Sequence, residues 1–372
     1  MLSKKLLFFF LIFIIFIQIN NGKQINIKAK EGYTNPKEAL FYKKMENKEV
    51  KCFLCPRECV IKEGDWGFCR ARKNIKGTLY SMGYGAPCSV HVDPIEKKPF
   101  LHFYPGTKAF SIASAGCNLR CKYCQNWEIS QTKPTETINL NLDPEYIPQI
   151  VINKEVKSIA YTYSEPTNFY EYMLDTAILA KKHGIKNVVH SSGYINPEPL
   201  KKLTNYIDAF CIDLKGFTEL YYRNICGADL QPVLNSLKVI KNNGVWLELV
   251  NLIIPTKNDD IKQIKKMCVW IKNNLGKSTP ISFSKYYPTH KLTNIPPTPL
   301  KTLEKAVKIA KEVGLEYVYI GNVPGHKYED TYCPECGVKL IDRYGYHIIY
   351  NKIKNGRCPN CSEKIEGVWN EK

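Results

Sequence analysis

Short apolar runs alternate with longer amphipathic stretches through the middle of the chain, from residue 108 to residue 325. The runs predict strands at residues 110–114, 158–163, 187–191, 209–214, 246–253, 281–286 and 317–320. Helical periodicity between them is clearest at residues 168–183, 257–274 and 299–313. Strands that alternate with helices predict right-handed βαβ units built around a parallel sheet.

Six or seven such units predict an α/β fold, a partial TIM-like (β/α)6 barrel. A doubly wound open sheet is the alternative. No G-x-G-x-x-G turn follows the first expected strand, so the sequence gives no support to a dinucleotide site.

Three segments flank this core. Residues 1–22 form a hydrophobic leader, in which twelve apolar residues (6–17) follow two lysines. That length fits a signal-peptide core and falls short of the ~20 residues of a spanning helix. We interpret the leader as an uncleaved membrane tether of a cytoplasmic protein, with export and a wrongly assigned start as alternatives. Residues 23–107 form a cysteine-rich module with a helical stretch expected near 36–45, and residues 330–369 form a second cysteine-bounded module.

The composition is that of a globular protein with a sizeable core, with 44% apolar and 24% charged residues. This excludes disordered, collagen-like and multi-spanning membrane chains. Lys and Arg outnumber Asp and Glu by 53 to 35, a net charge of +18 that can attract nucleic acid. Because the lysines are spread along the whole chain, we favour a compositional bias, and a nucleic-acid partner stays open.

Eleven of the fifteen cysteines fall into three groups. The groups are Cys52, Cys55, Cys59 and Cys69; Cys117, Cys121 and Cys124; and Cys333, Cys336, Cys358 and Cys361. Thiols two or three residues apart suit a shared metal or cluster better than disulfides, which favours a reducing compartment. The other four, Cys88, Cys211, Cys226 and Cys268, are interpreted as small buried hydrophobic residues.

The central group follows the first barrel strand as C-x3-C-x2-C. Three thiolates can hold three irons of a [4Fe–4S] cluster and leave the fourth iron without a protein ligand. An open metal position is typical of catalytic sites, and the amino and carboxylate groups of S-adenosylmethionine can chelate such an iron. Reductive cleavage of that cofactor would yield a 5′-deoxyadenosyl radical. The alternatives are a structural metal site or a cluster with a distant fourth cysteine.

This motif resembles the signature of the radical S-adenosylmethionine (radical SAM) superfamily, in a context similar to pyruvate formate-lyase activating enzyme. Residues 52–369 are most similar to the AmmeMemoRadiSam system radical SAM enzyme family. The supporting motifs are C-F-L-C-P-R-E-C at residues 52–59, D-P-I-E-K-K-P at 93–99, Y-S-E-P-T at 163–167, D-L-K at 213–215 and P-P-T-P at 296–299.

The resemblance implies a cofactor site built from the strand ends, where barrel enzymes carry their catalytic groups. Glu165 would bind the ammonium of S-adenosylmethionine, although the usual Gly-Gly-Glu is Tyr-Ser-Glu here. Ser191 follows the third strand, where small residues permit close approach of a ligand. Asp213 and Lys215 are carried over from the activating-enzyme subgroup as further cofactor contacts.

The C-terminal group consists of two C-x2-C pairs separated by 21 residues. Four thiolates of this kind predict a closed tetrahedral site in a zinc-ribbon-like module, with a rubredoxin-like iron as the rival. The N-terminal group, C-x2-C-x3-C-x9-C, has enough thiolates for zinc or for an auxiliary cluster, and the sequence leaves that choice open.

Together these features predict a radical SAM enzyme that abstracts hydrogen from an unknown substrate, for which a protein and RNA are both considered. It would need an electron donor such as a flavodoxin or ferredoxin, and the family name implies AMMECR1-like and Memo-like partner proteins. The rival function is a non-catalytic iron–sulfur or zinc protein for electron transfer or scaffolding.

Overall fold

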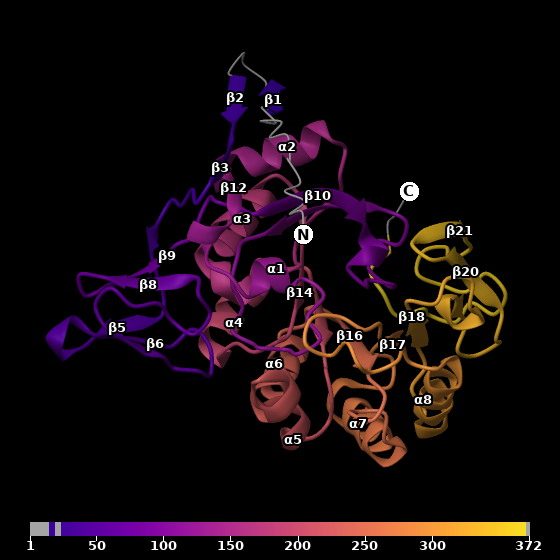
Figure 1. Cartoon of the computed structure of the whole chain (residues 1–372). Coiled ribbons are helices and arrows are strands. Elements are labelled where there is room, and N and C mark those ends of the chain that lie inside the picture. The colour runs from indigo at the N-terminus through magenta and orange to yellow at the C-terminus, as the bar shows by residue number, and fades with distance from the viewer. Residues whose placement is uncertain (1–14, 19–23, 370–372) are drawn as a thin grey trace, which may run out of the picture.

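The computed structural model describes residues 15–18 and 24–369, and its centre is one eight-stranded sheet (Figure 1). The strand order is β10-β11-β13-β14-β15-β16-β17-β18. The strands are β10 Ser89–Pro94, β11 Lys108–Ala113, β13 Ser158–Tyr161, β14 Lys186–Ser191, β15 Ala209–Asp213, β16 Trp246–Ile253, β17 Ile281–Lys285 and β18 Val318–Gly321. β10 is antiparallel to β11, and the other seven strands are parallel to one another.

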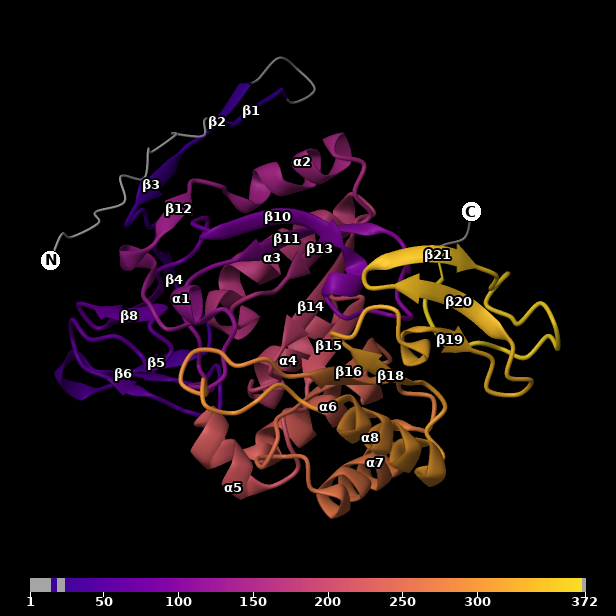
Figure 2. The ribbon, with the colours of Figure 1, turned by 45° about the vertical axis from the view of Figure 1, so that its right-hand side comes forward.

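The seven strands predicted from the sequence are therefore confirmed. Of the helices that connect them, six have seven residues or more: α2 Ile147–Asn153, α3 Tyr170–Lys182, α4 Pro197–Thr204, α6 Leu230–Asn242, α7 Ile261–Leu275 and α8 Leu300–Val313. Neighbouring parallel strands are also consecutive in the chain, so every right-handed crossover returns on the same side of the sheet. Figure 2 shows α6, α7 and α8 together along that side. The order never reverses, so the doubly wound alternative is wrong, and six strand–helix units closed by a seventh strand form a partial barrel.

Local sequence signals fix the ends of the long helices. Asp260 caps α7, because its side chain accepts a hydrogen bond from the backbone N–H of Gln263. Pro299 precedes α8, and Gly314 ends it with φ of 94°, a conformation that costs glycine little. Both helices bury apolar residues at helical spacing, including Ile264, Cys268, Ile271 and Leu275 of α7, against the sheet side.

The segment after β10 closes the floor of the barrel. Phe100 and Phe103 are fully buried there, and they pack on small residues near the amino ends of the strands: Ala109, Ala160, Val188 and Ala209. Because bulky rings fill the floor, the open space of the barrel lies toward the carboxyl ends of the strands.

The N-terminal module consists of small antiparallel sheets. Its strands are β3 Ala29–Glu31, β4 Lys37–Glu38, β5 Tyr42–Lys44, β6 Val50–Cys52, β7 Val60–Ile61, β8 Arg72–Ile75 and β9 Thr78–Ser81, with β12 Ile138–Leu140 pairing to β3. The helix expected near 36–45 is wrong, since β4 pairs with β9 and β5 pairs with β6. Phe41, with φ of 57°, turns the chain between these strands, so tertiary pairing outweighs local helical pattern here.

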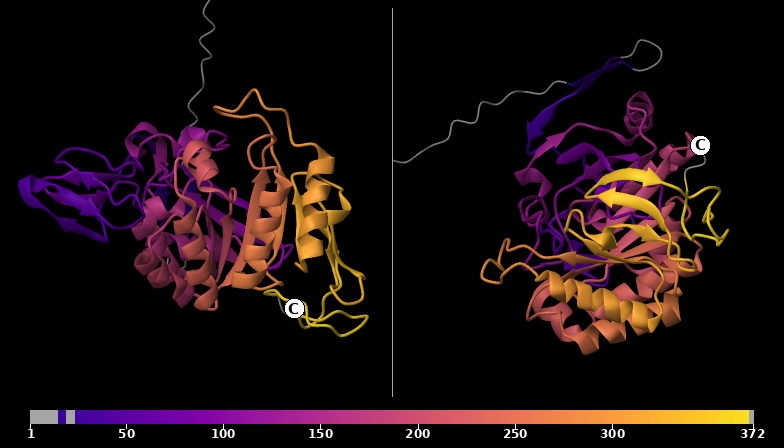
Figure 3. Two further views of the ribbon diagram at one scale, coloured as in Figure 1. Left: turned by 90° about the horizontal axis from the view of Figure 1, so that it is seen from below. Right: turned by 90° about the vertical axis from the view of Figure 1, so that its right-hand side faces the viewer.

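The C-terminal module is a three-stranded sheet of β19 Thr331–Tyr332, β20 Lys339–Tyr344 and β21 His347–Asn351. Figures 1 and 3 show this module and the N-terminal sheets on opposite sides of the barrel. Its last residues bind the barrel floor, because the Val368 backbone exchanges hydrogen bonds with His102 and Tyr104 at 2.7 and 2.8 Å. The domain limits drawn from the sequence stay a prediction.

Most of the predicted leader lies outside the described residues. Of it, only β1 Ile15–Gln18 is described, and it pairs with β2 Gln24–Ile27. Within residues 15–18 and 24–369, no helix has the length and apolar character needed to cross a membrane.

Candidate active site

One cavity of about 630 Å³ is lined by residues at the carboxyl ends of the barrel strands. Its lining includes every residue that the sequence assigned to the central cluster or the cofactor: Cys117, Cys121, Cys124, Glu165, Ser191, Asp213 and Lys215. These residues come from the ends of four different strands, and the sheet order brings those ends together. The structure therefore gathers the predicted set around one volume large enough for a small-molecule cofactor.

The loop after β11 carries the three central thiols and is pinned by backbone hydrogen bonds. Cys117 N–H donates to the carbonyl of Cys69 at 3.0 Å, and Arg120 N–H donates to the carbonyl of Cys226 at 2.8 Å. Cys226 ends the π-helix η6 Tyr222–Cys226, a type of irregularity often found at functional sites. The cluster loop is thus held between the N-terminal module and the segment that follows β15.

The environment of the thiols favours metal binding. The backbone N–H of Leu119 lies 3.3 Å from Cys117 Sγ, and the Ser130 hydroxyl lies 3.2 Å from Cys124 Sγ. Burial raises the pKa of Cys117 and of Cys124, so both would stay protonated without a positive partner. Iron binding removes those protons, and the donors at hand then stabilise the thiolate sulfurs.

Glu165 is buried, and its carboxylate accepts five hydrogen bonds. The donors are the N–H and hydroxyl of Thr167 (3.2 and 2.8 Å), the hydroxyl of Ser191 (2.6 Å), and the N–H and hydroxyl of Ser192 (2.9 and 2.6 Å). The two backbone donors fix the carboxylate, whereas hydroxyl groups rotate easily. An incoming ammonium group could therefore replace hydroxyl donors without moving Glu165.

Tyr163 explains the departure from Gly-Gly-Glu. Its φ is 63°, a left-handed conformation that glycine adopts freely and tyrosine adopts at a cost. Contacts of the side chain offset that cost: the hydroxyl donates to Asp93, and the Lys98 ammonium lies 4.0 Å from the ring centre. Lys98 is buried with its ammonium 2.7 Å from Asp93, and burial lowers the pKa of Lys98 to about 8.

Asp213 and Lys215 form an ion pair at the end of β15. Lys215 Nζ lies 2.8 Å from Asp213 Oδ2, and His190 Nε2 lies 3.0 Å from Asp213 Oδ1. Burial opposes ionisation of Asp213, but Lys215 and His190 together hold its pKa below the usual range. Burial also opposes the charge of Lys215, but Asp213 and the nearby Cys121 hold its pKa well above the usual value. The site therefore keeps an ammonium group, paired with the Asp213 carboxylate, beside the thiols.

The opposite wall of the cavity comes from two chain segments outside the central strands. Glu96 and Lys97 follow β10, and Arg343 and Tyr346 belong to the C-terminal module. Arg343 is 4% exposed and donates to the carbonyls of residues 329 and 101 and to the hydroxyl of residue 331. Its Nε and the Oε2 of Glu96 are buried without a hydrogen-bond partner among the described residues. Because both atoms are almost fully buried, a ligand could reach them only if the side chains moved.

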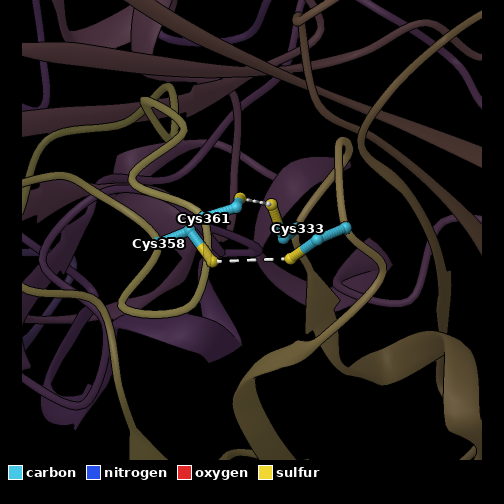
Figure 4. A group of neighbouring side chains, drawn as sticks. Cys333, Cys358 and Cys361 are labelled. Atoms are coloured by element: carbon cyan, nitrogen blue, oxygen red, sulfur yellow. Dashed lines mark hydrogen bonds between the residues drawn. The ribbon is translucent and has the colours of Figure 1, made fainter.

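The C-terminal thiols form a tight group (Figure 4). The sulfurs of Cys333, Cys336, Cys358 and Cys361 all lie within 4.8 Å of one another. Two pairs are 3.6 and 3.7 Å apart. Metal–sulfur bonds of ~2.3 Å in a tetrahedron place sulfurs about 3.8 Å apart, so the group fits one metal ion. Hydrogen bonding, chiefly from the backbone of Val338, lowers the pKa of Cys336 to about 6.

The other two cysteine groups have a different geometry. Within residues 15–18 and 24–369, the C-terminal set is the only group of three or more potential ligands gathered within 4.8 Å. In the central and N-terminal groups, no three sulfurs lie within 4.8 Å of one another. In a cubane cluster each thiolate binds a different iron, so wider spacing suits the central three.

Sequence reasoning missed several residues of the cavity. His190 could have been found from its place at the end of the third parallel strand, one residue before Ser191. Cys226 is buried as expected, but it also lies beside the cluster loop, where it lowers the pKa of Cys121. The sequence around Arg343 does not indicate a place in the cavity, because no local pattern shows that the C-terminal module reaches it.

Comparison with known proteins agrees with this geometry. The profile of the Radical SAM superfamily matches residues 111–268, which include all seven predicted cluster and cofactor residues. An uncharacterized protein of Methanocaldococcus jannaschii is 48% identical over 334 residues, 89% of this chain and 99% of its own. The pyruvate formate-lyase-activating enzyme of Clostridium pasteurianum is 24% identical over 168 residues, 42% of this chain and 67% of its own. The chain belongs to the radical SAM superfamily and is a radical SAM enzyme.

Proposed function

We propose that this enzyme abstracts a hydrogen atom from a polypeptide substrate, as an activating enzyme of the AmmeMemoRadiSam type. The observation that carries the proposal is the single cavity shared by three thiols and four polar strand-end residues. Similarity to a pyruvate formate-lyase-activating enzyme supports a protein substrate, and RNA modification is the second candidate. A purely structural or electron-carrying protein would not need the polar residues at the strand ends.

Each side chain has a role that follows from its position. Cys117, Cys121 and Cys124 would hold a [4Fe–4S] cluster, and Lys215 would balance its negative charge. The cluster and S-adenosylmethionine, when bound, supply one-electron cleavage to methionine and a 5′-deoxyadenosyl radical.

The strand-end groups would seat the cofactor. Glu165 would accept from its ammonium, Ser191 would bind close to it, and Asp213 would keep Lys215 and His190 in place. These groups orient the ligand, whereas the thiols build the cluster.

The substrate would meet the wall formed by Glu96 and Arg343. A buried donor and a buried acceptor that lack partners are costly unless a ligand satisfies them. A backbone amide offers one acceptor and one donor, so it could satisfy both atoms. The exposed ring of Tyr346 also lines the cavity, where an extended segment could pass it.

The remaining assignments follow from the cysteine geometry and the family resemblance. We assign zinc to the C-terminal group, because a closed site of four thiolates needs no redox chemistry to stabilise a small module. The electron donor would be a flavodoxin or ferredoxin, and AMMECR1-like and Memo-like proteins are proposed partners. A cytoplasmic location is proposed from the reduced thiols.

Deuterium transfer tests the substrate class. Cells that produce the enzyme are grown in deuterated medium, and their protein and RNA fractions are each incubated anaerobically with the reduced enzyme and unlabelled S-adenosylmethionine. Hydrogen abstraction from carbon transfers deuterium to 5′-deoxyadenosine, which mass spectrometry detects. We expect deuterated product with the protein fraction, and the Cys117→Ala/Cys121→Ala/Cys124→Ala variant should give none.

Two outcomes contradict the proposal. Deuterium arriving only from RNA would favour the second candidate, and deuterium from neither fraction would exclude a macromolecular substrate. Arg343→Gln serves as the substrate-side variant, in which unlabelled cofactor cleavage should continue while deuterium transfer falls at least tenfold. Equal loss of both activities would remove Arg343 from substrate binding.

A further inference from the structure

The N-terminal thiol group, defined as Cys52, Cys55, Cys59 and Cys69, is assembled by turns and a strand pairing. Cys52 ends β6, and its N–H donates to the carbonyl of Cys59 at 2.9 Å just before β7. Cys69 lies in the turn before β8, where Arg70 N–H donates to the carbonyl of Gly67 at 2.9 Å. Arg72, at the start of β8, joins the Cys69 turn to the first thiol, because its Nη1 lies 3.9 Å from Cys52 Sγ.

One cation lies against these thiols. Arg72, which is 1% exposed, places its guanidinium 3.9 Å from Cys52 Sγ. Cys52 is buried and the other three cysteines are partly buried. Arg72 also pairs with the buried Glu171 at 2.6 Å, so this carboxylate and the thiols would share its positive charge.

The spacing of the thiols distinguishes a cluster from a single ion. The C-terminal four thiols gather within 4.8 Å, as a single tetrahedral ion requires. The N-terminal four do not gather in this way, and neither do Cys117, Cys121 and Cys124 in the radical SAM motif. Neither of these two groups is gathered around a single ion, and the N-terminal thiol group has the fourth cysteine that a closed four-iron cluster needs and the central group lacks.

The N-terminal thiol group also touches the cluster loop directly. The Cys69 carbonyl accepts from Cys117 N–H at 3.0 Å, so one hydrogen bond joins a ligand of one group to a ligand of the other. The side-chain amide of Asn118 donates to the Tyr194 carbonyl at 2.8 Å, and the Asn118 carbonyl accepts from Arg57 Nε at 2.7 Å. The aromatic ring of Phe68 lies between the guanidinium groups of Arg57 and Arg120, 3.6 and 3.8 Å from its centre.

We infer that the N-terminal thiol group binds a second iron–sulfur cluster, closed by four thiolates, which passes electrons to the central cluster through the Cys69–Cys117 contact. One electron enters from a reduced flavodoxin- or ferredoxin-type protein, and the same electron leaves to the central cluster. No atom is transferred. The inference rests on the proposed central cluster as electron acceptor, and it adds a second redox site outside residues 111–268.

Metal content of the full chain tests the inference. Anaerobically reconstituted protein should contain about eight irons, because two cubane clusters hold four each. The Cys55→Ser/Cys69→Ser variant should keep about half of the iron and all of the C-terminal metal. Cys268→Ala removes a buried thiol of α7 that belongs to no group, and it should leave the iron content unchanged. About four irons with two zinc ions in the wild-type protein would overturn the inference.

Spectroscopy of the wild-type protein covers the case in which that variant fails to fold. Electron paramagnetic resonance of the reduced enzyme should show two iron–sulfur signals, of which one changes when S-adenosylmethionine is added. A single iron–sulfur signal would contradict the presence of a second cluster. Two signals, neither of which responds to the cofactor, would instead contradict the proposed function.

The choice of reductant tests the electron path. The Cys55→Ser/Cys69→Ser variant should cleave S-adenosylmethionine when dithionite is the donor, because a small reductant can reach the central cluster directly. With reduced flavodoxin its cleavage rate should fall at least tenfold relative to Cys268→Ala. Equal rates with flavodoxin in both variants would show that electrons bypass the N-terminal thiol group.

Discussion

Lys215 carries the positive charge of the ion pair in the candidate active site. It is buried, pairs with Asp213 at 2.8 Å and lies near Cys121. Lys215→Ala should weaken S-adenosylmethionine binding by roughly tenfold or more, since a charge-assisted contact contributes about 1.5–3 kcal/mol. Its iron content should stay intact, because the thiols hold the metal. Equilibrium binding and iron analysis check both parts.

The matched control for this prediction is Lys201→Ala, which removes an exposed lysine of α4. Lys215→Ala also leaves Asp213 buried without its cation, so part of the effect is local destabilisation. The double variant Asp213→Asn/Lys215→Ala separates the two contributions. If Lys215→Ala bound the cofactor as tightly as the control, Lys215 would have no part in cofactor binding.

For single residues, the sequence predicted which side chains bind the cluster better than it predicted which side chains contact one another. The spacing of Cys117, Cys121 and Cys124 was informative, because one short loop carries all three thiols. Tyr163 was visible only as a departure from glycine, and its positive φ and its bond to Asp93 depend on backbone geometry. Arg343 lies far along the chain from the other cavity residues, so only the folded structure shows its position.

The C-terminal module contributes both a metal group and part of the cavity wall. Cys336→Ser should lose about one metal ion per chain and keep the iron of the barrel, because its four thiols form a group of their own. Metal analysis against Cys88→Ser provides the check. Loss of barrel iron together with that ion would show that the two sites fold as one unit. Deleting the module is a poorer test, since Arg343 and Val368 would leave with it.

The junction between this module and the barrel floor should respond to pH. His102 is fully buried, with Nδ1 2.6 Å from the carbonyl of residue 366 and Nε2 2.5 Å from the Tyr319 hydroxyl. Burial lowers the pKa of His102 to about 3, whereas an unfolded histidine titrates near 6.5. Below pH 6.5 the unfolded chain binds a proton that the folded chain excludes. The free energy of unfolding therefore decreases as the pH falls below 6.5, by ~1.4 kcal/mol per pH unit.

Chemical denaturation at pH 6.5 and pH 5 measures this loss. Between pH 6.5 and pH 5, the free energy of unfolding should fall by about 2 kcal/mol less in His102→Phe than in the wild-type protein. His183→Asn, at an exposed position, should not change this fall. Comparison of variants is needed because burial raises the pKa of Glu248 to about 7, and that shift acts on stability in the opposite direction. An unchanged pH dependence in His102→Phe would rule out this histidine as the cause.

Among the elements, long periodic segments were predictable and short ones were not. The strands and the helices α3, α7 and α8 follow from buried periodic positions that tertiary packing reinforces. The helix predicted near residues 36–45 was wrong because the strands found there are only two and three residues long and pair with distant strands. Cross-strand pairing of that kind leaves little pattern in a local window.

The whole molecule is an open barrel whose two sides are completed by the flanking modules. The N-terminal module contacts the cluster loop, and the C-terminal module supplies part of the cavity wall. The alternation of strands and helices predicted the barrel and its active face. It did not predict these contacts, because they join residues far apart in the chain, such as Leu101 and Arg343.

The most direct test of the account is anaerobic incubation of the reduced, iron-loaded enzyme with S-adenosylmethionine alone. Slow formation of 5′-deoxyadenosine and methionine is expected, because three thiols leave one iron open to the cofactor. The Cys117→Ala/Cys121→Ala/Cys124→Ala variant should form neither product. A wild-type preparation with a full complement of iron that cleaves no cofactor, and whose iron spectrum does not change when the cofactor is added, would contradict the account.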